Sequence, residues 1–289
     1  MTPNAVRSVA TVLEEATRRL SDAGVPEPRR DASELLAMVL GTDRGGVVAR
    51  KFDPVASDAA DRYAALISSR ARRTPMQHLE GRSEFRGLTF DVGPMVLIPR
   101  PETEELVEVV LEAGLGTSAR IADLGTGCGC IAIALSVARP GWRLVAVDAA
   151  TDALSIARAN ADTHQVSDRI VFVNADFATP DAAWRGAFDA VVSNPPYIAE
   201  AEWRDLAPEV RDHEPNRALV PGPSGHEAYE VVGPAAFDML RPSGLLALEL
   251  GWTSEAAVRG IVTAAGFSDI VVRPDMQGIP RVLTARRRG

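Results

Sequence analysis

Four consecutive residues, Asn194-Pro195-Pro196-Tyr197, have the side chains and the order needed to hold a flat amino group. They follow an apolar run, Phe188 to Ser193, which predicts a buried strand. The two prolines fix φ and stiffen the turn. The side-chain oxygen of Asn194 and the backbone carbonyl of Pro195 can each accept one N–H of a planar NH2 group. Tyr197 offers an aromatic wall for that group.

A planar nitrogen needs such positioning because its lone pair is delocalised and it is a poor nucleophile. Two acceptors, one on each N–H, aim the lone pair at an electrophile. Both hydrogen bonds strengthen as the N–H groups become more polar in the transition state. No strong base is required, because the proton becomes acidic once the nitrogen is alkylated. Asn194, Pro195, Pro196 and Tyr197 are therefore the predicted catalytic residues.

A glycine-rich turn lies upstream of this tetrapeptide. Asp123 to Gly129 follows a predicted strand, Arg120 to Leu124, and precedes a predicted helix, Cys130 to Ala138. Glycines let the backbone turn tightly and let a ligand approach it without contacting a Cβ atom. A dinucleotide site would place a pyrophosphate at the helix N-terminus, whereas a methyl-donor site would seat the amino-acid end of S-adenosylmethionine there. The predicted cofactor-binding residues here are Gly125, Thr126, Gly127, Cys128 and Gly129.

Acidic residues at two further strand ends suit the rest of such a cofactor. Asp148 ends the second predicted strand, 21 residues after Gly127, where a carboxylate can accept both hydroxyls of a ribose. Asp176 and Phe177 follow the third strand. There the carboxylate or a backbone group could recognise adenine N6 and the Phe177 ring could pack on the adenine, although Phe177 also suits core packing. These residues alone fit a nicotinamide enzyme as well. The tetrapeptide favours the methyl donor, with Asn194 close to the transferred methyl.

Strands and helices alternate from residue 119 onward, which predicts an α/β fold of the Rossmann-like type, with a mostly parallel sheet and helices on both faces. No helix separates the last two strands, so they are expected to pair antiparallel. Ligands of such sheets bind beyond the carboxyl ends of the strands, which brings the glycine-rich turn and the tetrapeptide together. The predicted elements are strands 120–124, 144–148, 170–174, 188–193, 244–250, 270–273 and 282–286, and helices 102–111, 130–138, 152–163 and 254–265.

The preceding third of the chain has a different character. Apolar residues at helical spacing predict helices over Val6–Leu20, Asp31–Leu40 and Ser57–Ala71, which indicates a small helical bundle over residues 1–75. Residues 76–99 resemble a β-hairpin linker, in which Glu84–Val92 is followed, after Gly93-Pro94, by Met95–Ile98 as an expected strand. The catalytic domain is then expected over residues 100–289.

Composition bounds the classes of function. The chain of 289 residues has a net charge of −8, which argues against binding nucleic acid by charge alone. Its two cysteines, Cys128 and Cys130, suggest neither a disulfide framework nor a metal site, so no metal is expected. No segment suggests a membrane span or a signal peptide, so a cytoplasmic protein is expected.

The tetrapeptide and the glycine-rich turn together resemble class I methyltransferases that act on amino nitrogens. Within that group the chain is similar to the HemK/PrmC-type peptide chain release factor N5-glutamine methyltransferases. The resemblance covers residues 75–287. The supporting segments are Pro75–Gly81, Glu84-Phe85, Val96–Glu104, His213–Pro215, Ala218-Leu219 and Leu246–Gly251.

This resemblance implies an N-terminal helical domain that docks the substrate, a hairpin linker and a seven-stranded catalytic domain with an antiparallel final strand. It implies methyl transfer from S-adenosylmethionine, giving S-adenosylhomocysteine, to the glutamine amide in the Gly-Gly-Gln motif of class I release factors. Gly125 to Gly129, Asp148, Phe177 and Asn194 would contact the cofactor, and Asn194 to Tyr197 would hold the glutamine. Arg100 and Glu102 would order the edge of the site or simply begin a helix.

Three alternatives remain at this point. An adenine-N6 methyltransferase acting on DNA or RNA could use the same tetrapeptide on a flipped base. Residues 1–75 carry 12 basic and ten acidic residues, a mild basic excess that fits docking to nucleic acid only weakly. A non-catalytic binding module would not need the intact tetrapeptide Asn194–Tyr197. A nicotinamide oxidoreductase would need a proton-relay residue, for which the chain shows no obvious His or Tyr–Lys pair.

Overall fold

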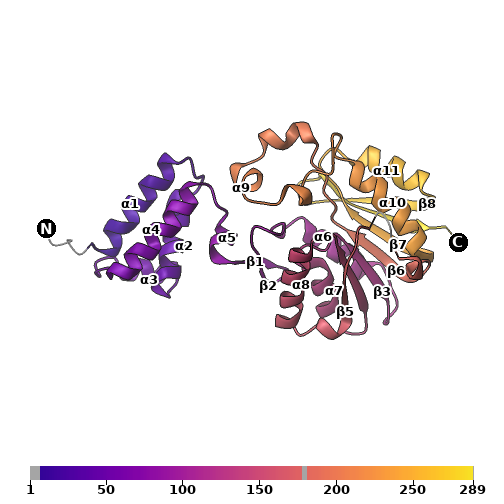
Figure 1. Cartoon of the computed structure of the whole chain (residues 1–289), viewed down its shortest axis with the longest axis horizontal. Helices are drawn as coiled ribbons and strands as arrows, with labels where there is room; N and C mark the ends of the chain where they lie inside the picture. The colour runs from indigo at the N-terminus through magenta and orange to yellow at the C-terminus, as the bar shows by residue number, and fades with distance from the viewer. Residues whose placement is uncertain (1–6, 178–180, 289) are drawn as a thin grey trace. The chain divides into compact units, whose positions relative to one another are not determined.

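The computed structural model describes residues 7–177 and 181–288, and it divides into two compact units (Figure 1). The first, called here the N-terminal unit, runs to Gly81 and also takes in a distant segment, Ala207–His213. The second, called the catalytic unit, comprises Arg82–Leu206 and the chain from Glu214 onward. The main chain therefore passes between the two units three times.

Helices build the N-terminal unit, as the sequence predicts. They are α1 (Val9–Asp22), α2 (Pro28–Leu40), α3 (Arg44–Ala49), α4 (Ser57–Ala71) and α5 (Met76–Glu80). Helix α2 begins three residues before the predicted start, because Pro28 occupies its first turn and leaves Asp31 inside the helix. The predicted helix residue Val6 lies outside the described residues. The buried core of this unit includes Val12, Leu20, Leu35, Leu36, Tyr63 and Ile67.

A partly buried ion-pair cluster attaches the segment Ala207–His213 to these helices. Its short helix α9 (Pro208–Arg211) carries Glu209, whose two oxygens accept hydrogen bonds from Arg73 Nε and Nη2, both at 2.7 Å. Arg70 Nη1 reaches Glu209 at 2.9 Å, and Arg70 Nε donates to Asp31 at 2.7 Å. The Arg70 side chain is only 7% exposed. Local sequence patterns gave no indication of this attachment, since 139 residues separate Arg70 from Glu209.

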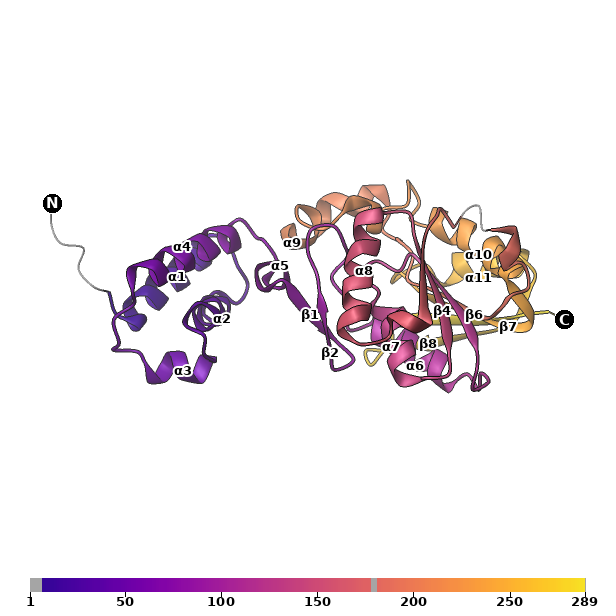
Figure 2. The same cartoon turned by 60° about the horizontal axis from the view of Figure 1, so that its bottom comes forward.

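A hairpin is present, but it lies earlier than expected: strands β1 (Arg82–Phe85) and β2 (Leu88–Asp91) pair largely within the segment Glu84–Val92, which was expected to be its first half. Arg86 and Gly87 form its two-residue turn, both with positive φ. The hairpin belongs to the catalytic unit and lies beside helix α8 (Thr151–Thr163) (Figure 2). Asn160 of α8 binds both backbone groups of Asp91 and also donates to the carbonyl of Cys128 in the glycine-rich turn. The hairpin is thereby anchored to the cofactor-binding region.

Two parts of the predicted linker differ from a hairpin. Met76–Glu80 forms α5 and groups with the N-terminal unit, whose boundary falls at Gly81 and not at residue 75. The predicted strand Met95–Ile98 is wrong, since this stretch is a turn followed by irregular backbone. Pro94 directly precedes this stretch and Pro99 directly follows it, and proline supplies no N–H for a strand ladder.

The seven-stranded mixed sheet of the catalytic unit is confirmed. Its order is β5-β4-β3-β6-β7-β9-β8, and β9, between β7 and β8, is the one strand that runs opposite to the other six. The strands are β3 (Arg120–Leu124), β4 (Arg143–Asp148), β5 (Ile170–Asn174), β6 (Phe188–Ser193), β7 (Leu240–Glu249), β8 (Phe267–Pro274) and β9 (Pro280–Arg287). The order places β3 and β6, which carry the two functional loops, side by side at the centre.

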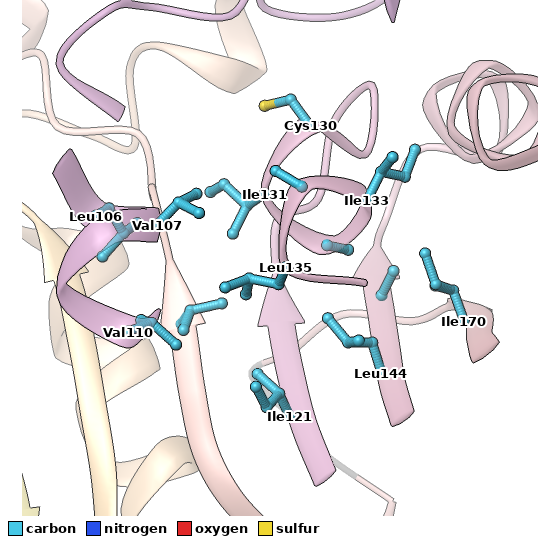
Figure 3. Packing of buried hydrophobic residues seen from close by; sticks show 14 of the residues in the cluster. Leu106, Val107, Val110, Ile121, Cys130, Ile131, Ile133, Leu135, Leu144 and Ile170 are labelled. Carbon is cyan, nitrogen blue, oxygen red and sulfur yellow. The ribbon is translucent and has the colours of Figure 1, made fainter. Parts of the chain in front are cut away.

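Helices cover both faces of this sheet. Helices α6 (Thr103–Glu112) and α7 (Cys130–Ala138) bury Leu106, Ile131 and Leu135 against one face (Figure 3), and α8 buries Ala153 and Ala161 in the same cluster. Helices α10 (Glu227–Met239) and α11 (Glu255–Ala264) bury Tyr229 and Val258 against the other. Short 3-10 turns connect the larger elements at Ser167–Arg169, Ala182–Trp184, Glu200–Asp205 and Asn216–Ala218. None of the helices over the described residues is long and apolar enough to cross a membrane.

The attachment of Glu209 generates a stability prediction. Replacing Glu209 with Gln removes the charge that both Arg70 and Arg73 contact, so the N-terminal unit should lose about 1–3 kcal/mol of free energy of unfolding. Hydrogen exchange followed by mass spectrometry on peptides from α2 and α4 measures this loss. Glu200→Gln, a change at an exposed position, is the control.

The difference in stability between wild type and Glu209→Gln should depend on pH. Burial raises the pKa of Glu209, but Arg73 and Arg70 outweigh it and leave that pKa below its ordinary value. The stabilisation by Glu209 should therefore be fully present above about pH 4.3 and vanish as the pH falls through the lowered pKa. An equal gap between wild type and variant at pH 7 and at strongly acidic pH would contradict this account.

Candidate active site

The glycine-rich turn joins β3 to α7 with its backbone open on one side. Gly125 and Gly127 have φ values of +76° and +56°, and a Cβ atom on either would meet no atom within 4 Å. Gly129 differs, because a Cβ there would lie 3.0 Å from Ile133 and 3.2 Å from Ala157. The first two glycines therefore leave room for a ligand, whereas the third allows close packing of two helices.

Asp148 holds this turn in place from the end of β4. Its Oδ2 accepts the backbone N–H of Gly127 at 2.9 Å, and its Oδ1 accepts that of Ala150 at 2.9 Å. The two bonds together fix the orientation of the carboxylate. Each oxygen keeps further acceptor capacity for a ligand hydroxyl. Asp148 thus has the position expected for a ribose-binding acid.

A cavity of about 560 Å³ connects the glycine-rich turn with the tetrapeptide. Of the predicted site residues, seven line it: Gly125, Gly127, Asp148, Asp176, Phe177, Asn194 and Pro196. Residues far apart in sequence are therefore brought to one side of the sheet, at the carboxyl ends of its strands. The cavity also touches Met95, Leu97 and Arg217, which the sequence did not identify as site residues.

The remaining five predicted site residues lie behind the cavity lining. Thr126 is buried and donates to Asp123 at 2.6 Å, and Cys128 is buried beside the hydrophobic core. Gly129 packs against α7 and α8, as described above. Pro195 is buried, and Tyr197 packs against the core beneath α10 and α11. Their side chains therefore support the loops more than they face the cavity.

Tyr197 is held tightly from two directions. A Cβ on Gly251 would lie 2.9 Å from Cδ2 of the Tyr197 ring, so only glycine lets the backbone pack this closely there. The Tyr197 hydroxyl donates to Glu249 Oε1 at 3.4 Å. Burial, followed by the charge of Glu249, raises the pKa of Tyr197, so the phenol stays protonated. This ring is a fixed support for the tetrapeptide.

Asn194 is oriented by a chain of hydrogen bonds that sequence analysis missed. Its Nδ2 donates to Thr103 Oγ1 at 3.1 Å, and Thr103 Oγ1 donates to Glu249 Oε2 at 2.6 Å. Thr103 is the first residue of α6, and Glu249, which is 0% exposed, ends β7. An acid inside the apolar run Leu245–Leu250 was the available sequence signal for Glu249. Thr103 lies within the segment Val96–Glu104 that supports the family resemblance, but no local pattern marked it as a site residue.

A second buried acid braces the segment before α6. Glu214 accepts from Arg100 Nη2 at 2.6 Å and from the backbone N–H of Ile98 at 3.2 Å. Its side chain is 1% exposed, whereas that of Arg100 is 29% exposed. Arg100 and Ile98 therefore share one buried carboxylate, which braces the irregular stretch from Leu97 to Pro101 beside the cavity.

Metal ligands are not clustered anywhere in the two described stretches of chain, taking three or more His, Cys, Asp or Glu as a cluster. The cavity offers open backbone at glycines, a fixed carboxylate and an oriented amide. These groups can bind a polar cofactor and can hold a planar nitrogen beside the Asn194 amide. This arrangement needs no charged base to remove a proton from that nitrogen.

Family models match both parts of the chain. The PrmC N-terminal domain matches residues 11–81, and the methyltransferase small domain matches residues 101–213. The first ends at the boundary of the N-terminal unit, and the second contains both functional loops.

Solved structures share the fold of the catalytic unit. A methyltransferase from Pyrococcus furiosus aligns with a TM-score of 0.53 and 18% identity, over 77% of this chain and 99% of that one. The hMettl16 catalytic domain, solved in complex with a MAT2A 3'UTR hairpin, aligns with a TM-score of 0.56 and 19% identity, over 77% and 81%.

Curated relatives match almost the whole chain. A release factor glutamine methyltransferase from Mycolicibacterium smegmatis is 41% identical over 280 residues, covering 96% of this chain and 97% of the relative. One from Chlorobaculum tepidum is 40% identical over 287 residues, covering 96% and 97%. At this identity and coverage, with a cavity that joins the glycine-rich turn to Asn194 and Pro196, the chain belongs to the release factor glutamine methyltransferase family.

Proposed function

We propose that this enzyme transfers a methyl group from S-adenosylmethionine to the side-chain amide nitrogen of the glutamine in the Gly-Gly-Gln motif of class I peptide chain release factors. One observation carries the proposal: a single cavity is lined by the glycine-rich turn, by Asp148 and by Asn194 with Pro196. Donor and acceptor can therefore meet in one place. A release factor as the substrate makes the cytoplasm the proposed location.

The residues around the cavity fit the proposed cofactor. Gly125 and Gly127 present backbone without Cβ obstruction, which suits the amino-acid end. Asp148 would accept the two ribose hydroxyls, and Asp176 with Phe177 would contact the adenine. When bound, S-adenosylmethionine supplies a methyl group on a positively charged sulfur.

The tetrapeptide would hold the glutamine amide in the reactive orientation. The Asn194 side-chain oxygen and the Pro195 carbonyl would accept its two N–H groups, which leaves the nitrogen lone pair directed at the methyl group. Both acceptors would bind the more acidic N–H groups of the transition state more strongly. Two prolines and the packed Tyr197 ring keep these acceptors from moving.

The relatives favour a protein acceptor over an adenine base, since each carries the name of a release factor methyltransferase. The likeness to an RNA-bound catalytic domain extends to the fold alone. The N-terminal unit is the proposed docking domain for the release factor.

Asn194→Ala should abolish methyl transfer, because the glutamine nitrogen that receives the methyl group loses one of the two oxygens that accept its N–H groups. Binding of S-adenosylmethionine should survive largely unchanged, as the cofactor loop and Asp148 remain. Mass spectrometry of the Gly-Gly-Gln peptide after incubation of release factor with enzyme and donor measures the first effect, and calorimetry measures the second. Turnover close to that of the wild type would refute the proposed mechanism.

Asp148→Ala should weaken cofactor binding by about 1–3 kcal/mol, for the loss of charge-assisted hydrogen bonds. Asp152→Ala is the matched control. Asp152 also lines the cavity, but its half-buried carboxylate is already paired with Arg217 at 3.0 Å. Calorimetric titration of both variants compares the two acids. An unchanged dissociation constant for Asp148→Ala would remove this residue from the cofactor site.

A further inference from the structure

The amide of Asn194 poses a problem that its position alone does not solve. Its oxygen and its NH2 group have nearly the same shape, so the side chain fits its place in two orientations related by a flip. Only the amide oxygen of Asn194 can accept a hydrogen bond from the N–H of the nitrogen that is to be methylated. With the NH2 group turned toward the acceptor, two donors would face each other. Some other group must therefore decide which end of the amide faces the cavity.

Thr103 provides that decision. A threonine hydroxyl has one hydrogen, and here it is donated to Glu249 at 2.6 Å. Toward Asn194 the hydroxyl can then act only as an acceptor, which matches the 3.1 Å bond from Asn194 Nδ2. The nitrogen end of the amide is thus occupied by Thr103. Since Asn194 lines the cavity, the oxygen is the end left for the acceptor.

Glu249 in turn fixes the direction of the Thr103 hydroxyl. An ionised carboxylate has no hydrogen and accepts from both of its donors, Thr103 on Oε2 and Tyr197 on Oε1. A protonated carboxyl would gain a hydrogen of its own and could donate to Thr103. The threonine hydrogen would then be released toward Asn194, which reverses the whole chain.

We propose that Glu249 and Thr103 are positioning residues whose hydrogen bonds hold Asn194 with its side-chain oxygen toward the acceptor nitrogen. Neither residue lines the cavity, so both act through Asn194. This inference rests on the proposed function only for the identity of the acceptor, since the orientation of Asn194 can be observed without turnover.

The surroundings of Glu249 place its titration within reach of experiment. Burial raises its pKa to about 7, against the lowering effects of the Thr103 hydroxyl and the charge of Arg281. Glu102 opposes ionisation, Tyr197 donates to the carboxylate, and Tyr229 donates to the backbone carbonyl of Glu249 at 2.8 Å. The orienting form is the ionised one, so turnover should rise with pH through about 7 and level off above it.

Thr103→Val is the central variant, because valine keeps the shape of threonine and loses both hydrogen-bonding roles. The turnover number should fall by about tenfold to a hundredfold, while the dissociation constant for S-adenosylmethionine stays within about threefold. Thr103→Ser retains the hydroxyl and should restore most of the lost turnover. Thr163→Val, on the exposed side of α8, is the matched control and should behave as wild type. Equal turnover losses in the valine and serine variants would overturn the proposal.

Glu249→Gln tests the direction of the chain. A glutamine presents one acceptor oxygen and one NH2 donor, so it cannot accept from both Thr103 and Tyr197. Turnover should fall and its rise near pH 7 should disappear. Asp123 also has a pKa that burial raises to about 7, which makes this comparison necessary. A variant that keeps both the wild-type turnover and the full rise would refute the role of Glu249.

The orientation of Asn194 can also be measured directly. The chain has only five asparagines, so its side-chain NH2 groups can be resolved by NMR after selective 15N labelling. The Asn194 signal, assigned by its loss in Asn194→Ala, should exchange with water about tenfold faster in Thr103→Val than in wild type or Thr103→Ser. Unchanged exchange would overturn the inference. A wild type that shows the protected signal but leaves release factors unmethylated would instead refute the proposed function.

Discussion

One buried carboxylate, that of Glu249, constrains the catalytic end of the molecule. It is fully enclosed at the end of β7, where it accepts hydrogen bonds from Thr103 on α6 and from Tyr197 on the acceptor loop. Enclosing a charge is costly unless its lone pairs are occupied, so these elements must stay in register with one another. The sheet provides that register by pairing β6 directly with β7.

The donor side of the cavity depends on a different kind of constraint. Asp148 grips the backbone of the glycine-rich turn, and Asn160 fastens the same turn to the β1–β2 hairpin. Both contacts are made to backbone groups, so they survive changes in the side chains of the turn. The open edge at Gly125 and Gly127 is consequently a property of the scaffold, and cofactor chemistry can use it without reorganisation.

The sequence predicted what depends on local pattern and motif. Strand and helix periodicity revealed the alternating domain, and the tetrapeptide at the end of β6 revealed the acceptor chemistry. Thr103 and Glu249 escaped prediction because their meaning lies in a contact across 146 residues. The same reason applies to the pair Arg70–Glu209 and to the cavity residue Arg217. In sequence, a charged residue of this kind looks like an ordinary surface residue until its partner in the fold is known. Met95–Ile98 misled because apolar periodicity ignores nearby prolines.

The return of Ala207–His213 to the N-terminal unit makes that unit a discontinuous domain. The ion pairs of Glu209 close a long loop of chain, much as a disulfide would, but reversibly and without redox chemistry. The loop they close contains the tetrapeptide. Cutting the chain after Gly81 would therefore not yield two independent modules. The catalytic fragment would keep Ala207–His213 without the helices that bind it, and the helical fragment would lack this segment of its own fold. A chimaera that exchanges the N-terminal unit must therefore exchange both of its stretches together.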